Sequence, residues 1–97
     1  KISLKKGMVV SNEPGYYEKD NFGIRIENLV YVKDKRKGMT FENLTMAPIE
    51  KDLIIKENLS KDEKKWLNNY HQTVFKNLIK SMNKIEASKL KRACSAI

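Results

Sequence analysis

The spacing of apolar residues changes once along this chain, and the change limits the folds available to it. Between residues 24 and 32, apolar side chains recur at every second position, which is the period of a β-strand. Between residues 66 and 82 they recur at intervals of three and four, which is the period of an α-helix. The pattern predicts an α+β fold, with antiparallel strands followed by a long helix and a short C-terminal helix.

The long helix is predicted over residues 60–83. Ser60 and Glu63 have the spacing of a capping box, in which each side chain bonds the other residue's backbone N–H. The residues that follow form one wide apolar stripe, which we interpret as a packing face: Trp66, Leu67, Tyr70, Val74, Phe75, Leu78 and Met82. His71 lies at the edge of this stripe and is expected to be structural or exposed. Residues 85–97 are expected to add the short second helix.

Residues 7–32 are predicted to form two strands around a turn. Met8, Val9 and Val10 favour a strand, and Pro14 with Gly15 interrupts regular structure. The second strand is expected to run from residue 24 to residue 32. Residues 33–38 are expected to form a charged hairpin loop, followed by a short strand that begins near residue 41 and ends at residue 48.

Charge and composition argue against several classes of protein. The net charge of +8 comes mainly from lysines that alternate with acidic residues, and arginine occurs only at positions 25, 36 and 92. Because arginine is the preferred side chain for reading phosphates and bases, we predict no nucleic-acid partner. No apolar run approaches the roughly 18 residues of a membrane span, so no membrane partner is predicted. The single Cys94 is expected to be a solvent-near thiol in a reducing compartment.

Two carboxylates in the strand region carry the possible chemistry. Glu13 ends the first strand, and Glu27 lies inside the second strand close to Arg25. If the strands pair antiparallel, Glu13 and Glu27 face each other, with Arg25 on the same face as Glu27. Carboxylate oxygens are hard ligands for divalent ions. From spacing alone, both metal ligation and surface or ion-paired glutamates stay open.

The residues around both glutamates resemble a known family. Residues 11–17 (SNEPGYY) and 23–28 (GIRIEN) are similar to the last two metal-ligand motifs of the pita-bread metallopeptidases, the creatinase/methionine-aminopeptidase superfamily. Within it, the resemblance is closest to the X-Pro aminopeptidases of the three-domain cytosolic aminopeptidase P type. Residues 7–10, 44–49 and 66–71 also fit, and the resemblance runs from about Gly7 to about Leu78. It implies the C-terminal portion of the pita-bread fold.

The resemblance implies a role for four residues. The family's site has two aspartates, one histidine and two glutamates, in that chain order. Glu13 matches the first glutamate, which binds one metal ion and moves the proton of the attacking water. Glu27 matches the second, which bridges both ions. Arg25 matches an arginine that braces an upstream ligand carboxylate, and Tyr16 is interpreted as a wall of the substrate pocket.

The resemblance also implies an activity and its partners. The family uses two divalent metal ions, usually Mn²⁺, with Zn²⁺ or Co²⁺ also possible, to remove the N-terminal residue from peptides with proline at the second position. Residues 1–58 would be strands of the catalytic domain, and residues 59–97 a helical extension. A cytoplasmic location and a homodimer with a contact within residues 41–80 are also implied.

The chain departs from the family in one respect. It has no segment similar to the aspartate and histidine motifs, so it is interpreted as a fragment with two of five ligands, whose partner is the upstream part of the same enzyme. Several alternatives stay open: a relative of prolidase or methionine aminopeptidase, a non-catalytic pita-bread interaction module, and a basic binding domain.

Overall fold

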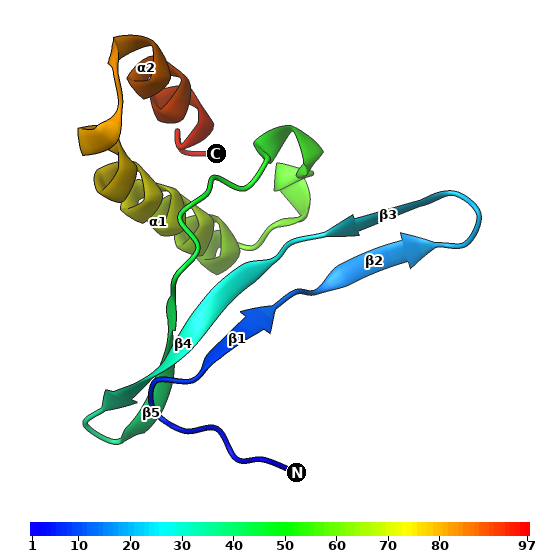
Figure 1. Cartoon of the computed structure of the whole chain (residues 1–97). Coiled ribbons are helices and arrows are strands. Elements are labelled where there is room, and N and C mark those ends of the chain that lie inside the picture. The colour runs from blue at the N-terminus through cyan, green and yellow to red at the C-terminus, as the bar shows by residue number, and fades with distance from the viewer. The chain divides into compact units, whose positions relative to one another are not determined.

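A computed structural model describes residues 1–97, which form two compact units, Lys1–Thr45 and Met46–Ile97. The first unit contains every strand and the second contains every helix, so the predicted order of antiparallel strands, a long helix and a short helix is confirmed (Figure 1). No helix in the chain has the length and apolar character that crossing a membrane requires.

The first unit is built from three antiparallel strand pairs. β1 (Val9–Asn12) pairs with β4 (Asn28–Lys35), and β4 pairs on its other side with β5 (Gly38–Asn43). β2 (Gly15–Glu18) pairs with β3 (Phe22–Arg25) in a separate two-stranded hairpin. Figure 1 shows that this hairpin continues the β1–β4 pair along the same two chain segments.

The strand predicted over residues 24–32 is interrupted, which corrects the sequence interpretation. β3 ends at Arg25 and β4 begins at Asn28, with Ile26 and Glu27 between them. Pro14 lies across from this break, and it has no backbone N–H to donate to the opposite strand. Only the bond from the Ile26 N–H to the Pro14 carbonyl remains, at 3.1 Å. The break is therefore a local consequence of the proline, and the two chain segments stay paired.

The charged segment 33–38 is mostly strand, so the predicted hairpin loop there was too long. β4 continues to Lys35, and only Arg36 and Lys37 lie between it and β5. The Lys33 ammonium donates to the Glu42 carboxylate at 2.7 Å across the strand pair. The hydrogen bond to Lys33 lowers the pKa of Glu42. β5 ends at Asn43, so the strand expected to end at residue 48 is shorter and earlier.

The second unit contains α1 (Lys61–Leu78) and α2 (Lys84–Ala93). The capping box of Ser60 and Glu63 is present, with both hydrogen bonds formed. The helix ends at Leu78, earlier than the predicted residue 83, and a 3₁₀ turn follows it over Ile79–Ser81. A second capping box, made by Asn83 and Glu86, then starts α2 and confirms the short C-terminal helix.

The core of the second unit lies between the two helices and the segment before them. Its buried residues are Tyr70, Val74, Leu90 and Cys94. The Tyr70 hydroxyl donates to the Ala47 carbonyl at 2.6 Å, so the segment that begins at Met46 packs with the helices. Two short 3₁₀ turns, Lys51–Leu53 and Lys56–Asn58, lead from this segment to α1. The domain boundary expected at residue 58 stays a prediction.

Cys94 is buried, and the prediction of a solvent-near thiol was wrong. Its side chain belongs to the core because the last turn of α2 packs against α1. Burial raises the pKa of the Cys94 thiol, which keeps it protonated and unreactive near neutral pH.

His71 is a structural residue, one of the two outcomes that the sequence left open. Its side chain is fully buried, and its Nε2 accepts the Ile49 N–H at 3.1 Å. Nε2 can accept this bond only while it carries no proton. Burial, and then the positive charge of Lys51, lower the pKa of His71, so the neutral form is the native one.

We predict that the free energy of unfolding of the helical unit falls as the pH falls from 8 to 5.5. The unfolded state takes up a proton near pH 6.5 and the folded state resists it, so stability is complete above that pKa and is lost below it, by at most about 1.4 kcal/mol per pH unit. Urea unfolding followed by the fluorescence of Trp66 measures this slope. His71→Gln, whose amide oxygen can accept the Ile49 N–H, should flatten it, and an unchanged slope in this variant would contradict the assignment.

Candidate functional site

Glu13 and Glu27 lie directly across from each other on the two paired segments. Asn12 pairs with Asn28, and Gly15 pairs with Arg25. Two residues separate these pairs on each segment, so the same register sets Glu13 opposite Glu27. Directly opposed residues of an antiparallel pair have side chains on the same face, with Cβ atoms about 4.5–5.5 Å apart. The pairing geometry that the sequence predicted is therefore present.

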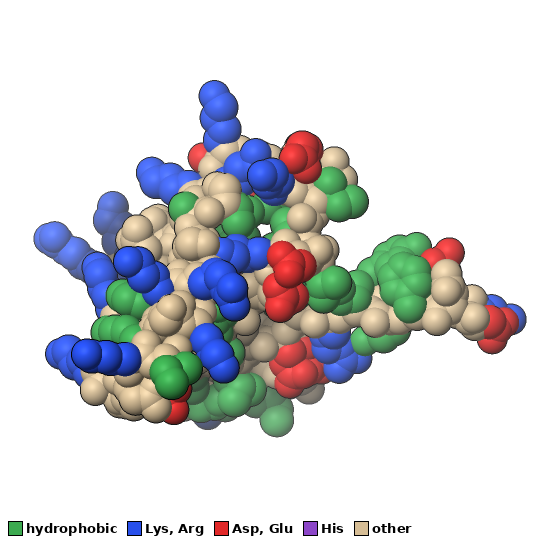
Figure 2. All heavy atoms as spheres, turned by 90° about the horizontal axis from the view of Figure 1, so that it is seen from above, with side chains coloured by type: hydrophobic (Ala, Val, Ile, Leu, Met, Phe, Trp, Pro, Cys, Tyr) green, Lys and Arg blue, Asp and Glu red, His purple; other side chains and the backbone are tan.

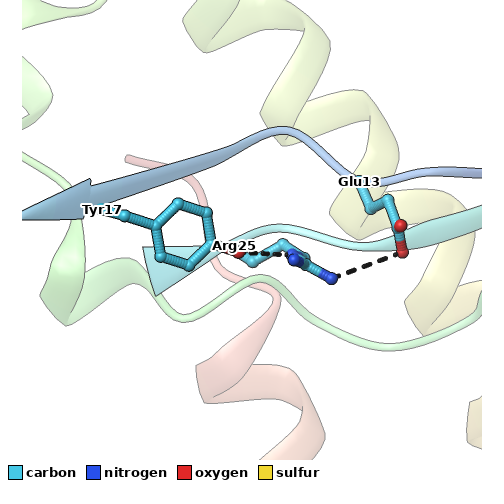
Figure 3. A network of polar contacts seen from close by, with 3 residues as sticks. All are labelled: Glu13, Tyr17 and Arg25. Atoms are coloured by element: carbon cyan, nitrogen blue, oxygen red, sulfur yellow. Dashed lines mark hydrogen bonds and ion pairs between the residues drawn. The ribbon is translucent and has the colours of Figure 1, made fainter. Parts of the chain in front are cut away.

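Arg25 lies on the same face of the hairpin as both carboxylates. It precedes Glu27 by two residues, and alternate residues of a strand share a face. Its Nη1 lies 3.7 Å from Oε2 of Glu13. Its Nε donates to the Tyr17 hydroxyl at 2.8 Å, and its guanidinium carbon lies 5.7 Å from the centre of the Tyr17 ring. Figure 3 shows the three side chains in a row along the hairpin.

The charges of this face act on one another. The hydrogen bond to Tyr17 raises the pKa of Arg25, and the carboxylates of Glu13 and Glu27 act in the same direction. Glu13 and Arg25 are both about half exposed, with side-chain exposures of 43% and 46%. An exposed ion pair at this separation contributes little to stability. The arrangement of these charges is therefore better explained by a chemical role than by a contribution to the stability of the fold.

Tyr17 is the residue of this face that the sequence analysis missed. Its ring lies over the backbones of Gly15 and Gly23, where a Cβ atom would come within 2.9 Å and 2.5 Å of the ring carbons, respectively. Neither position accepts a side chain without displacing the ring. Two glycines on the face that carries the charged residues were the available signal. Gly15 was interpreted as part of a break in regular structure, and Gly23 as the first residue of the motif at residues 23–28.

Tyr16 lies on the opposite face from the carboxylates. It pairs with Ile24, and its ring centre lies 5.9 Å from that of Phe22. Ile26 follows Ile24 on the same face, and all four apolar side chains are exposed. We call Tyr16, Phe22, Ile24 and Ile26 the apolar hairpin face. The pocket-wall role expected for Tyr16 stays a prediction.

The residues on the charged face fit part of a metal site. Glu13 and Glu27 offer four carboxylate oxygens at one place, and such oxygens suit Mg²⁺, Mn²⁺ or Zn²⁺. No group of three or more histidine, cysteine, aspartate or glutamate side chains gathers anywhere in the chain. Two carboxylates leave most positions of a metal ion open. The pair can therefore contribute ligands to a site, and the other ligands must come from elsewhere.

Two family models match this chain, one after the other. Residues 1–34 match metallopeptidase family M24, and residues 37–97 match the C-terminal region of peptidase M24. The first match contains Glu13, Tyr17, Arg25 and Glu27, and the second contains both helices.

Curated relatives and a solved structure agree with these matches. The chain is 52% identical over 81 residues to the probable Xaa-Pro aminopeptidase P of Coprinopsis cinerea, covering 75% of this chain and 13% of that protein. It is 43% identical over 91 residues to the probable Xaa-Pro aminopeptidase P of Pyrenophora teres f. teres, covering 86% of this chain and 14% of that protein.

The structure of X-prolyl aminopeptidase from Caenorhabditis elegans matches with a TM-score of 0.82 at 35% identity, over 97% of this chain and 17% of that one. That protein is described as a cytosolic enzyme with a di-nuclear active site. The match confirms the predicted fold class, the C-terminal portion of the pita-bread fold. The chain spans between an eighth and a sixth of the length of the proteins it matches. It belongs to the peptidase M24 family, of which it carries the C-terminal region.

Proposed function

We propose that this chain supplies Glu13 and Glu27 to the dinuclear metal site of an aminopeptidase that removes the N-terminal residue from peptides with proline at the second position. The observation that carries the proposal is the register that opposes the two glutamates on one face, with Arg25 beside them. The Xaa-Pro aminopeptidase names of the relatives, and the di-nuclear site of the matched structure, support the reaction class.

Glu13 is proposed as the residue that moves the proton. When bound, a pair of divalent ions lowers the pKa of water and polarises a scissile carbonyl. The Glu13 carboxylate would accept the proton of the attacking water and later donate it to the proline nitrogen that leaves. Glu27 would help to hold both ions. Arg25 would balance the negative charge that the two carboxylates bring together.

The large accessible surface of the chain supports the proposal that it is part of a larger protein. The accessible surface is 8340 Å² for 11.3 kDa. A globular protein of this mass exposes about 5,700 Å², and two separate globules of half the mass expose about 6,900 Å² together. Figure 2 shows hydrophobic side chains at the surface of the β2–β3 hairpin. We propose that the upstream part of the same enzyme covers the apolar hairpin face and supplies the other metal ligands.

We also propose the identity of the metal ion, the cellular location and the substrate class. Mn²⁺ is the proposed ion, since carboxylate ligands are compatible with it, and Zn²⁺ and Co²⁺ are the alternatives. A cytoplasmic location is supported by the description of the matched C. elegans enzyme as cytosolic. The names of the relatives favour an X-Pro aminopeptidase over prolidase or methionine aminopeptidase. The presence of both glutamates argues against a non-catalytic module.

Glu13→Gln is expected to lower kcat of the peptidase that contains this chain by about 10²–10⁴-fold, because the amide cannot accept the proton of water. Release of the N-terminal residue from an Xaa-Pro peptide measures the effect, and an Xaa-Ala peptide tests specificity. Glu18→Gln is the matched control, since Glu18 is an exposed carboxylate of β2 that bonds only the Asn21 side chain. Wild-type turnover by Glu13→Gln would refute its assigned role.

The 97-residue chain alone is expected to bind Mn²⁺ only weakly. Its two carboxylates leave most coordination positions to water, so the dissociation constants should lie above about 1 μM. Isothermal titration tests this, and the double variant Glu13→Gln, Glu27→Gln should remove the remaining heat of binding. Two sub-micromolar sites in the chain alone would show that its ligand set is larger than proposed.

We also expect a homodimer, with Trp66 as the proposed anchor of its interface. The apolar stripe of α1 is partly covered, because Tyr70 and Val74 belong to the core, whereas Trp66 is 59% exposed and stacks on Tyr70 at 5.4 Å. Tryptophan is a frequent interface anchor, and its loss costs about 2 kcal/mol or more. Trp66→Ala should therefore raise the dimer dissociation constant about 30-fold in sedimentation. Ile85→Ala is the control, because Ile85 is an exposed residue of α2. A wild-type peptidase that sediments as a monomer at micromolar concentration would exclude the dimer.

A further inference from the structure

The pairing of β4 with the segment of β5 ends in a β-bulge two residues from Glu27. Backbone groups of successive strand residues point to opposite edges, and those of Val32 bond to the β1 side. The backbone groups of Leu29 therefore point toward the β5 side. The Leu29 carbonyl accepts both the Leu44 N–H, at 2.8 Å, and the Thr45 N–H, at 3.4 Å. Two residues thus lie opposite one, which is the arrangement of a bulge.

The side chain of Thr45 completes the pairing at this bulge. Its Oγ1 accepts the Leu29 N–H at 2.7 Å, in the place where a regular ladder would use a backbone carbonyl. The Asn43 side-chain amide donates to the Thr45 carbonyl, so the bulge is also held from within its own segment. Both side chains are half-buried. Leu29 is therefore the first residue of β4 that is held from the β5 side.

The backbone around Glu27 depends on this anchor because its support on the opposite edge is weakened. There Pro14 has no N–H to donate, and only the bond from the Ile26 N–H to the Pro14 carbonyl remains. Glu27 and Leu29 are alternate residues of one extended segment, so they share a face. The peptide unit that carries the Leu29 N–H lies one residue from Glu27, and a rotation of that unit changes the direction of the Glu27 side chain.

We infer that Thr45 is a positioning residue for the metal site: its hydroxyl oxygen fixes the start of β4 and thereby the direction in which Glu27 presents its carboxylate. The inference rests on the proposed function and deepens it. Thr45 acts through the backbone of Leu29 and needs no contact with a metal ion or a substrate. Partners that orient a metal ligand control affinity, because a displaced ligand oxygen binds the ion less tightly. Bulges serve this purpose in other sheets, where they re-aim a side chain next to an active site.

Thr45→Val tests the inference, because valine keeps the β-branched shape and removes the accepting oxygen. The Mn²⁺ affinity of the peptidase that contains this chain should fall by about 10-fold or more, as loss of a partner that orients a metal ligand typically does. Saturating Mn²⁺ should restore most of kcat. Thr45→Ser keeps the oxygen and should keep the Mn²⁺ affinity close to that of the wild type. Titration of the metal-free peptidase with Mn²⁺ measures all of these affinities.

Thr40→Val is the matched control, because Thr40 is an exposed threonine of β5 that pairs with Lys33, away from the bulge. It should leave the Mn²⁺ affinity unchanged. Wild-type Mn²⁺ affinity in Thr45→Val would overturn the inference. An equal loss of affinity in Thr45→Ser and Thr45→Val would overturn it too, because serine retains the oxygen to which the role is assigned.

Hydrogen exchange separates this inference from the proposed function. In the peptidase that contains this chain, the Leu29 N–H should exchange with water at least about 10-fold faster in Thr45→Val than in the wild type, because the opened amide loses its protection. An unchanged rate would refute Thr45 as the anchor of Leu29, whatever the enzyme does. Wild-type Mn²⁺ affinity in Glu27→Gln, with the Leu29 N–H still protected, would instead refute the proposed function.

Discussion

The antiparallel pairing of residues 9–18 with residues 22–31 keeps one register across its central break, and the position of every candidate site residue depends on that register. Pro14 removes one backbone donor at the break, yet the hydrogen bond from the Ile26 N–H to the Pro14 carbonyl keeps the two segments in the same register. A slip of one residue would move Glu27 to the apolar hairpin face and leave Glu13 alone. The turn at residues 19–21 and the pairs on both sides of the break prevent that slip.

The two faces of the hairpin differ in chemical character. One face carries Glu13, Tyr17, Arg25 and Glu27, whose charges influence one another. The other face carries four exposed apolar side chains, which a protein in water does not leave uncovered without cost. A strand pair that is charged on one face and apolar on the other is suited to cover an apolar core with one face and to present the other to polar surroundings.

Local signals in the sequence were sufficient to predict part of this structure. The capping box of Ser60 and Glu63 predicted the start of α1, because both partners lie within one turn. The resemblance directed attention to Glu13, Arg25 and Glu27, and the register brings them to one face. Long-range contacts explain the rest. The strand through Lys33 was interpreted as a loop because its pairing with β5 does not show in its charges, and Cys94 is buried by the packing of α2 on α1.

The central claim is that Glu13 and Glu27 bind metal ions from one face of the hairpin. Anomalous diffraction at the manganese edge, from crystals of the Mn²⁺-loaded peptidase that contains this chain, tests it most directly. Two manganese peaks are expected on the face of Arg25, with a carboxylate oxygen of Glu13 and both oxygens of Glu27 within about 2.0–2.6 Å of an ion. Manganese peaks away from these carboxylates, or the two glutamates on opposite faces of the hairpin, would contradict it.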